Sequence, residues 1–513
     1  MPAPSFAKSA SSAASALLSL LLVGGARGQG LSVANSTQSL SGFPPCDALI
    51  AANLSHAVHL PSSPLYPSLV LGSWSLDIQR SPWCFVLPRT ASEVSQTLTA
   101  LQAAGDGAGD WHIAIRSGGH GSDNANSITD GIIIDLSLLN STTYHEAANI
   151  ASVGTGARWG EVYAELEKSG VSVTGGREGV VGVGGLLLGG GVSWYTARTG
   201  FACDSVVNYE VVLVSGLVVN ANATDNSDLF RALKGGGCNF GIVTRFDLEA
   251  FPAANFTQTN FVDAVAAFTD LDQSFDDNAM ISVLTYDPRS ESIAITVTEV
   301  NTMNHANSTA FDAFRRLPTL TPPTEQSITL AQSANRTQLP GNTRNVGAGP
   351  LTIANDPRVM RYCLEQHDGL VADLKATLGP QNFSTILDFQ PLPSYFVDIG
   401  VQKGGNMLGL ERNLRNRIMF VSGVTLLTPD SISQFPRVYQ KLSVMLRRIT
   451  AFAESVGSSD TFVYLPYADA TNDPLGSYGA ANVKHLRLAA KKYDPHGFFQ
   501  HRVPGGFKID RVG

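Results

Sequence analysis

Three glycine-rich runs in this chain combine bare backbone with a few side chains that could do chemistry. The first run, Arg116-Ser117-Gly118-Gly119-His120-Gly121, directly follows a predicted strand. Glycines at this density leave backbone N–H groups free to line a concave site for an anionic pyrophosphate. His120 would add a neutral imidazole, which is a competent nucleophile toward an electrophilic carbon. The plainer alternative is a glycine-rich turn with an exposed histidine.

The second run is the longest stretch of bare backbone, with ten glycines between positions 175 and 200. Among them are Gly182, Gly184, Gly185, Gly189 and Gly190. Such backbone would let a cofactor lie flat against the chain. The spacing superficially resembles a dinucleotide fingerprint, but that fingerprint needs a strand before it, a helix after it and an acid about 20 residues on. More glycines follow here instead, and the nearest acid falls in a predicted loop, so a nicotinamide site is disfavoured.

The third run joins a predicted helix to a predicted strand. It reads Gly235-Gly236-Gly237-Cys238-Asn239-Phe240-Gly241-Ile242-Val243. A glycine cap at the helix end is the plain interpretation. Three glycines followed by an asparagine exceed what a cap needs, so backbone contacts to a ligand are also expected here.

Short elements must hold these runs, and their pattern indicates an α+β protein. We expect strands at 84–87, 112–115, 132–134 and 242–248, and a hairpin from 206–214 to 217–219 about Ser215-Gly216. Thr90 and Glu93 predict a capping box for a helix to residue 104, and another helix is expected at 158–169. Beyond residue 256 the pattern predicts an antiparallel sheet, with strands at 280–286 and 293–299, covered by helices at 356–378 and 431–456. A last helix is expected at 482–492.

Composition limits the class of protein and of partner. Of 513 residues 43% are hydrophobic and 15% charged, which is typical of a folded globular chain, and the net charge is −8. Since no basic stripe is present, nucleic acid is not an expected partner. We expect a monomer with a small-molecule substrate and no membrane anchor.

The first 28 residues read as an export signal. Lys8 precedes an apolar stretch from Ala13 to Val23, and small residues follow up to Gly28. The expected compartment is therefore the secretory pathway, extracellular or a secretory or vacuolar lumen. Eight glycosylation sequons support that route, at Asn35, Asn53, Asn140, Asn222, Asn255, Asn307, Asn335 and Asn382. Of the five cysteines, Cys46 and Cys84 are expected to pair and to staple the N-terminal segment onto the first strand.

Together the motifs resemble the FAD-linked oxidases of the vanillyl-alcohol-oxidase type, and within them the berberine-bridge-enzyme-like branch. The fungal members of secondary metabolism are the most similar. The resemblance runs from Trp83 to Lys508 and rests on 116–120, 182–191, 208–214, 233–246, 404–406 and 493–499. It implies a two-part PCMH-type FAD-binding domain at 80–252, a substrate domain at 253–460 and a returning segment at 461–513. The signal at 1–28 and a segment at 29–79 would precede them.

The resemblance also implies a role for each matched residue. His120 matches the histidine bonded to the 8α-methyl of FAD, and Ser117 to Gly121 match the pyrophosphate loop with their backbone. Arg116, which directly precedes this loop, is also expected to contact the cofactor. The backbone at 182–191 would pass beside the flavin ring, and Asn239, Gly241, Ile242 and Val243 would contact the cofactor. Glu178 stands where some members carry a second, cysteinyl tether, so a single histidyl bond is predicted. Val181 matches the valine associated with access of molecular oxygen, which favours oxygen as electron acceptor.

One departure concerns the strand that returns to the flavin. The family usually has Tyr-x-Asn-Tyr-Ala, whereas this chain reads Tyr464-Leu465-Pro466-Tyr467-Ala468. Proline lacks both an N–H and a side-chain amide. Tyr464 and Tyr467 are the predicted catalytic residues, with an aromatic pair that fills the interdomain core as the alternative. Asp388 is a further candidate base, with a solvated acid at a strand end as the favoured alternative.

The resemblance favours a secreted flavoprotein oxidase in secondary-metabolite biosynthesis, for example of a mycotoxin. It would dehydrogenate an alcohol or close a ring oxidatively, with a hydride passing to flavin N5 and oxygen as acceptor. One alternative is a carbohydrate oxidase that forms a lactone, although sugar-oxidising relatives often carry both tethers. The other alternative is a flavin-binding glycoprotein without turnover, with Pro466 as the lesion.

Overall fold

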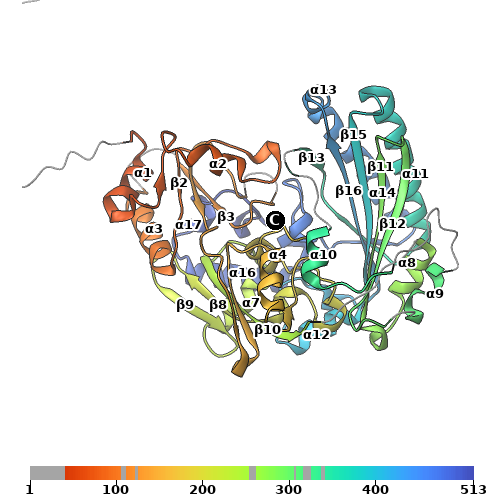
Figure 1. The fold of residues 1–513 in the computed structure, drawn as a ribbon, viewed down its shortest axis with the longest axis horizontal. Helices are drawn as coiled ribbons and strands as arrows, with labels where there is room; N and C mark the ends of the chain where they lie inside the picture. Colours follow the sequence, from red (N-terminus) through yellow and green to blue (C-terminus); the bar gives the residue numbers. More distant parts are fainter. Residues whose placement is uncertain are drawn as a thin grey trace, which may run out of the picture. The chain divides into compact units, whose positions relative to one another are not determined.

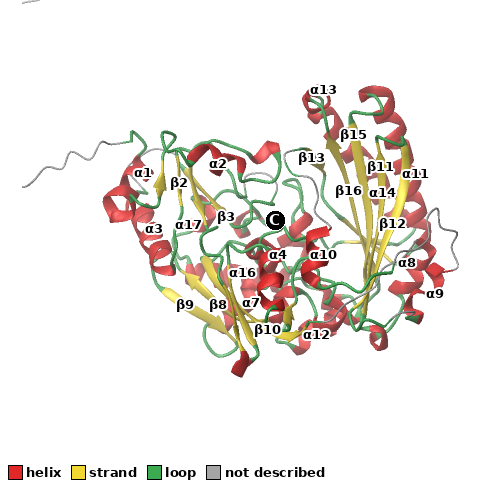
Figure 2. Cartoon of the chain, in the orientation of Figure 1, coloured by secondary structure: helices red, strands yellow, loops and turns green. Residues whose placement is uncertain are grey.

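The computed structural model describes residues 41–105, 111–121, 125–253, 262–305, 308–315, 325–336, 341 and 343–513. The predicted signal at 1–28 and the sequons at Asn35, Asn255 and Asn307 lie outside these residues. Three sheets with helices packed against them form the described chain (Figure 1, Figure 2). The predicted α+β class and the antiparallel sheet covered by helices are confirmed.

The first sheet is mainly parallel and has the order β1-β2-β4-β3. Its strands are β1 (Val58–His59), β2 (Cys84–Val86), β4 (Gly131–Asp135) and β3 (His112–Arg116). All residues of β2 and β4 are buried, as the run of isoleucines at 132–134 leads one to expect of a strand covered on both faces. Helix α3 (Ala91–Ala103) follows β2, and the Thr90 side chain caps it by accepting a hydrogen bond from the Glu93 N–H.

The second sheet is antiparallel and has the order β5-β6-β10-β8-β9, with β7 added beside β10. The strands are β5 (Thr142–His145), β6 (Ile150–Gly154), β7 (Val171–Val173), β8 (Val206–Val212), β9 (Val218–Asn222) and β10 (Ile242–Pro252). The predicted hairpin from β8 to β9 is confirmed, and Gly216 in its turn has φ +82°. The helices of this part are α4 (Trp159–Glu167), α5 (Val183–Leu188), α6 (Thr196–Thr199) and α7 (Ser227–Leu233).

The third sheet is antiparallel and has the order β12-β11-β15-β16-β14-β17, with β13 also paired to β16. The strands are β11 (Asn278–Asp287), β12 (Ser292–Asn301), β13 (Arg344–Gly347), β14 (Leu351–Ala354), β15 (Phe383–Leu392), β16 (Arg417–Leu426) and β17 (Ser459–Asp460). Leu387 and Phe389 of β15 pack in one core with α11 (Pro357–Leu378) and α14 (Phe435–Ser455). Because strand residues alternate between faces, Asp388 and Gln390 point to the opposite face.

The helix predicted at 431–456 is in fact two helices, α13 (Pro429–Ser433) and α14. Gln434 between them has ψ 7°, and Pro436 lies in the first turn of α14. A proline ring there would clash with the carbonyl of a preceding helical turn, so the helix restarts. Other short helices are α8 (Val262–Thr269), α9 (Asp312–Arg315), α10 (Leu330–Arg336) and α12 (Tyr395–Gln402).

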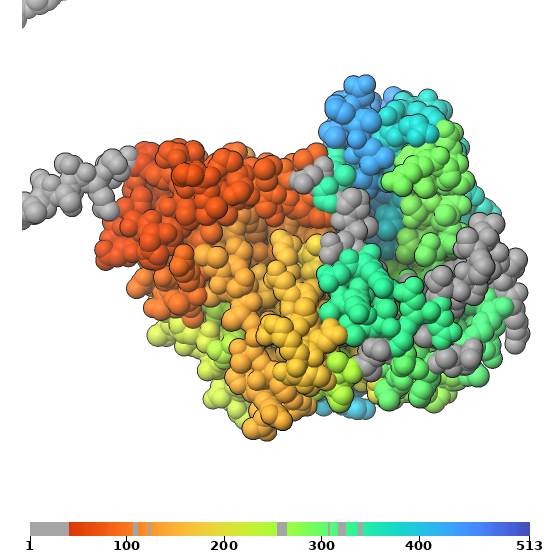
Figure 3. Space-filling view, in the orientation of Figure 1, coloured from red at the N-terminus to blue at the C-terminus, as the bar shows by residue number. Residues whose placement is uncertain are grey.

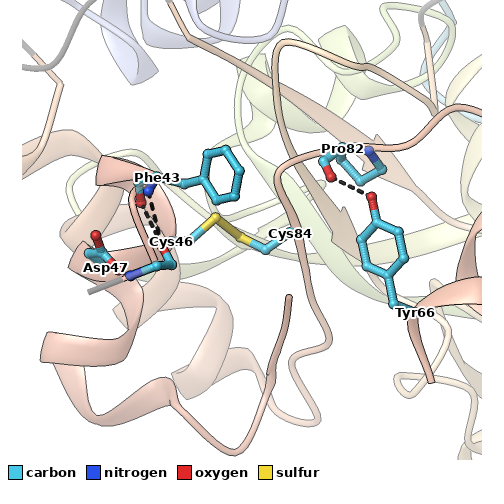
Figure 4. The surroundings of a disulfide bond; sticks show 7 residues. Phe43, Cys46, Asp47, Tyr66, Pro82 and Cys84 are labelled. Carbon is cyan, nitrogen blue, oxygen red and sulfur yellow. Dashed lines mark hydrogen bonds between the residues drawn. A yellow bond between two sulfur atoms is a disulfide. The ribbon is translucent and has the colours of Figure 1, made fainter. Parts of the chain in front are cut away.

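The two ends of the described chain are both tied to the first sheet. The disulfide between Cys46 and Cys84 is present and joins α1 (Pro44–Leu49) to β2 (Figure 4). Helix α2 (Tyr66–Leu71), which the sequence did not predict, is anchored by the Tyr66 hydroxyl, which donates to the Pro82 carbonyl.

The C-terminal part folds back onto that sheet. Its helices are α15 (Pro474–Ser477), α16 (Ala480–Tyr493) and α17 (Phe498–His501). Phe498 and Phe499 pack into the core of the first sheet, and the Ile113 N–H donates to the Arg502 carbonyl at 2.7 Å. Within the described ranges no helix is both long enough and apolar enough to cross a membrane.

Candidate functional site

The first two glycine runs meet at the end of β3. The backbones of Gly118 and Gly182 touch, since a Cβ atom on Gly118 would lie 2.4 Å from the Cα of Gly182. Ser117 locks the contact: its hydroxyl donates to the Thr155 carbonyl at 2.7 Å and accepts from the Gly184 N–H at 3.3 Å. Residues of both predicted runs therefore form one continuous surface.

His120 lies at the end of the first run in a mostly buried position. Its imidazole stacks on the Trp74 indole, with ring centroids 4.3 Å apart and planes 18° apart. The His120 Nε2 atom is buried and has no hydrogen-bond partner among the described residues. Burial, and secondarily the Arg158 guanidinium, lower the pKa of His120 to about 4. The imidazole is thus neutral at ordinary pH, and the exposed-turn alternative is wrong.

The third glycine run packs beneath the second. The Gly237 N–H donates to the Leu188 carbonyl at 3.1 Å. The Asn239 side chain is buried and holds the C-terminal tail, because its amide donates to the Phe507 carbonyl at 3.0 Å and its oxygen accepts from Gln500 at 3.1 Å. Gly241 leaves no room for a side chain: a Cβ there would lie 2.7 Å from Val211 Cγ1.

Arg116 serves the fold with its side chain. Its Nε donates to Asp135 Oδ2 at 2.9 Å, and its NH1 donates to the Leu69 carbonyl at 2.8 Å. Both members of the ion pair are buried. The guanidinium is therefore committed within the protein, and only the Arg116 backbone is left for the predicted cofactor role.

Two observations show that the glycine runs and His120 fit a bound FAD. Gly185 is exposed, and a Cβ atom there would meet nothing within 4 Å, so the middle of the second run borders open space. The buried and unpartnered Nε2 of His120 shows that the imidazole is not committed to a protein partner. Val181, next to Gly182, is half-buried beside this surface.

A polar cluster joins β15 of the third sheet to the second glycine run and to the turn at 464–467. The Arg177 NH2 donates to the Tyr467 hydroxyl at 2.9 Å and to Gln390 Oε1 at 2.7 Å. Gln390 Nε2 in turn donates to Asp388 Oδ1 at 3.2 Å. Four side chains from three distant segments thus form one hydrogen-bonded network.

Asp388 occupies the middle of β15, so its favoured reading as a solvated acid at a strand end is wrong. The side chain is buried, with 7% of its surface exposed. Burial raises the pKa of Asp388 to about 7, although Arg177 and the hydrogen bond from Gln390 act in the opposite direction. A carboxyl with this pKa can both accept and release a proton near neutral pH.

The rings of the two predicted catalytic tyrosines lie edge to face, with their centroids 4.9 Å apart. The Tyr464 hydroxyl accepts from the Val192 N–H at 2.7 Å, which ties it to the second glycine run. Burial raises the pKa of Tyr464 well above its ordinary value, and it also raises that of Tyr467 despite the neighbouring Arg177. Both phenols are therefore protonated at neutral pH.

Three members of the site had no predicted role: Trp74, Arg177 and Gln390. Gln390 could have been found, because it is two residues from Asp388 and so shares its face of the strand. Arg177 directly follows Gly175 and Gly176, but its partners come from more than 200 residues away. Trp74 lies in a segment with no motif.

The predicted glycosylation sites and the free cysteines differ in exposure. Among the described sequons, Asn53, Asn140 and Asn335 are exposed and Asn222 and Asn382 are half-buried. Cys203 and Cys363 are buried free thiols, and Cys238 is a half-buried one.

Comparison with known proteins identifies a family and similar proteins within it. A family model described as an FAD binding domain matches residues 82–222. The FAD-dependent monooxygenase drtC of Aspergillus calidoustus is 35% identical over 450 residues, covering 84% of this chain and 83% of that protein. The FAD-dependent monooxygenase sdcF of Emericella nidulans is 33% identical over 480 residues, covering 91% and 98%.

Among solved structures, berberine bridge enzyme from Eschscholzia californica superposes with a TM-score of 0.66 at 18% identity. The superposition covers 90% of this chain and 98% of that chain. At this identity the likeness shows the fold.

Proposed function

Because the chain belongs to the fungal FAD-dependent oxidoreductases of the berberine-bridge-enzyme-like branch, the family of drtC and sdcF, we propose that it is an oxidase of a small natural product. Its reaction would be dehydrogenation of an alcohol or an oxidative ring closure. One observation carries the proposal: the Asp388 network is connected to the glycine surface through the turn at 464–467. In that turn the Tyr464 hydroxyl accepts a hydrogen bond from the Val192 N–H, and the Tyr467 hydroxyl accepts one from Arg177.

The cofactor would be held by backbone from the first two glycine runs. Bound FAD supplies a two-electron acceptor for a hydride from a substrate C–H bond. Ser117 to Gly121 and Gly182 to Gly190 would line it, and His120 would be bonded to it. With Glu178 in place of a second cysteine, the histidyl bond is the single tether.

Asp388 is the base in this proposal. Its carboxylate would take the proton from the substrate O–H or N–H that adjoins the oxidised carbon. Gln390 fixes the position of the carboxylate by donating to Oδ1. Arg177 fixes Gln390 and Tyr467 in turn, so the side chains around the base are held before the substrate binds. Tyr467, protonated at neutral pH, would donate a hydrogen bond to the substrate.

Val181 beside Gly182 supports molecular oxygen as the electron acceptor of an oxidase. The second candidate function is monooxygenation, which the names of the relatives favour. Turnover under ¹⁸O₂ separates them. An oxidase releases hydrogen peroxide in a 1:1 ratio to product, and the product carries no label. A monooxygenase leaves one ¹⁸O atom in the product and forms little peroxide. A carbohydrate oxidase would oxidise sugars in the same assay.

The covalent bond is tested on the purified protein. Acid precipitation should leave yellow flavin in the pellet, and His120→Ala should release it to the supernatant or give colourless protein. A white wild-type pellet under a yellow supernatant refutes the bond.

Export is supported by the Cys46–Cys84 disulfide and by the exposed sequons. We expect the protein in the growth medium of a fungal host, with a mass that falls on endoglycosidase treatment. Retention in the cytosol at the unmodified mass would contradict the route.

A further inference from the structure

A strap formed by residues 69–79 crosses over the loop that carries His120. It is fastened to that loop by two hydrogen bonds: the Trp74 N–H donates to the Gly119 carbonyl at 3.0 Å, and Arg116 NH1 donates to the Leu69 carbonyl at 2.8 Å. Gly119 has φ +70°, so its backbone conformation favours glycine and holds the carbonyl in place.

The other end of the strap is fastened to the third sheet. Ser75 Oγ and the Leu76 N–H both donate to the Thr343 carbonyl, at 3.2 and 3.3 Å. Asp77 pairs with Arg344 at 3.8 Å. In the space-filling view the red residues of the first part of the described chain lie beside teal residues of the later part that contains the third sheet (Figure 3). Because both ends are fixed, the position of Trp74 between them is also fixed.

The indole of Trp74 lies flat on the imidazole of His120. The ring centroids are 4.3 Å apart, and both Trp74 Nε1 and His120 Nε2 are buried without a partner among the described residues. No hydrogen bond between these side chains holds the pair, so stacking is what fixes the plane of the imidazole. The same contact removes one face of the ring from water.

We propose that Trp74 is a positioning residue for the attachment of FAD to His120: its indole fixes the imidazole plane and keeps the ring dry and neutral until the bond forms. This inference rests on the proposed covalent bond. In that step an imidazole nitrogen forms a C–N bond with the 8α-methyl carbon, and the imidazole N–H and one methyl C–H bond break. The electron pair and both protons end on dioxygen, by way of the flavin, as hydrogen peroxide.

Neutral imidazole is required because the protonated ring has no lone pair for the attack. The charged groups near it are Arg158, which disfavours the protonated ring, and the buried Arg116–Asp135 pair. Removal of the indole would let water reach the ring and would weaken the largest cause of its lowered pKa, which is burial. Attachment of FAD should then become slower. As the pH is lowered, the loss of attachment should begin at a higher pH than in the wild type.

The test compares attachment rates. Protein from a riboflavin-limited host is mixed with FAD between pH 5 and pH 8, and covalent flavin is followed by in-gel fluorescence of the denatured band. Trp74→Ala should slow attachment at least about tenfold at pH 6 and move its acid limb toward pH 6.5. Trp74→Phe, which keeps a stacking face, should remain within a few-fold of wild type. Trp83→Leu, which removes an indole that stacks on Phe43, is the matched control and should attach at the wild-type rate.

The results distinguish a failure of the proposed role of Trp74 from a failure of the proposed covalent bond. Attachment by Trp74→Ala at the wild-type rate throughout pH 5–8 overturns the role of Trp74 and leaves the covalent bond intact. Absence of covalent flavin in the wild type overturns the bond and the role together. If Trp74→Ala does not fold, judged by its melting curve, Trp74→Leu carries the same test, because it fills the space without an aromatic face.

Discussion

The ring of Pro466 lies directly on Gly189, where a Cβ atom would come within 2.8 Å of the proline Cγ and 3.0 Å of its Cδ. This contact joins the tyrosine-bearing turn at 464–467 to the second glycine run. Relatives of the family usually carry an asparagine at this position of the turn. Here the asparagine amide is lost, and a rigid proline ring packs closely on Gly189 instead. Pro466 therefore has a structural role, which a substitution that only abolished turnover would not have.

Gly189→Ala should therefore destabilise the protein. Gly189 has φ −97°, which any residue adopts, so the effect is steric. Neither the proline ring nor the helix end can yield easily, and overpacking of this kind costs about 1–3 kcal/mol. Chemical denaturation measures the free energy of unfolding. The double variant Gly189→Ala/Pro466→Ala should recover most of the loss, because the clashing atoms are gone.

Gly369→Ala is the control for this variant. Gly369 lies within α11, where a Cβ would meet nothing within 4 Å, so alanine there should stabilise the helix by about 1 kcal/mol. Equal stability changes at positions 189 and 369 would mean that the contact with Pro466 has no energetic weight.

Asp388 should give the reaction its pH dependence. The pKa of Asp388 is raised to about 7, so the carboxyl is protonated below that pH and becomes a base above it. We expect kcat/KM to rise with pH through a limb near 7. Asp388→Asn should lower kcat by about 10²–10⁴-fold and abolish the limb, as the loss of a general base does.

Asp368→Asn is the matched control, since Asp368 lies on α11, which covers the opposite face of the sheet. Its pH profile should match that of the wild type. A limb near pH 7 that survives in Asp388→Asn would assign it to another group, and the base would then have to be sought elsewhere.

Local patterns were enough to predict most of the fold. The isoleucine run of β4, the capping residue Thr90 and the Ser215-Gly216 turn each act over a few residues, and each element lies where it was expected. The helix at 431–456 was predicted as continuous because its apolar spacing runs on past Pro436. The break depends on one ring clash, which periodicity does not report.

The site was predictable only where one segment carries it. His120 and the glycines around it stand in contiguous runs, so their role could be inferred from the resemblance. The burial of Asp388 was not predicted, because it depends on β11 and β16, which pair with β15 on either side. The contact of Trp74 with His120 spans 46 positions of sequence and belongs to no motif. Burial and long-range stacking are tertiary properties that a linear pattern does not encode.

Removal of the Cys46–Cys84 disulfide should lower stability by about 2–4 kcal/mol. The bond closes a loop with a sequence separation of 38, and the loss of this constraint raises the entropy of the unfolded chain. The double variant Cys46→Ser/Cys84→Ser is compared with wild type by denaturant titration, with and without dithiothreitol. Reductant should lower the wild-type midpoint and leave that of the variant unchanged. A reductant effect of equal size on both would trace it to another bond.

Lys508 should make stability rise with pH in the alkaline range. Its ammonium is buried and donates to the Cys238 carbonyl at 3.2 Å. Burial lowers the pKa of Lys508 to about 8, against 10.5 for an ordinary lysine. Between these two values the unfolded chain binds a proton that the folded chain has released, so this group adds stability as pH rises from 8 to 10.5. Each unit of the pKa difference is worth about 1.4 kcal/mol.

Buried thiols and phenols oppose this trend, because their raised pKa values favour unfolding at high pH. The measurement is therefore the difference in unfolding free energy between wild type and Lys508→Met at each pH, which cancels the other groups. That difference should grow in favour of wild type from pH 8 to pH 10.5. Lys492→Met serves as control: the hydrogen bond to Asp228 raises the pKa of Lys492 to about 12, so its contribution changes only above this window. A flat difference for Lys508→Met would show that its ammonium remains charged in the folded protein up to the ordinary lysine pKa.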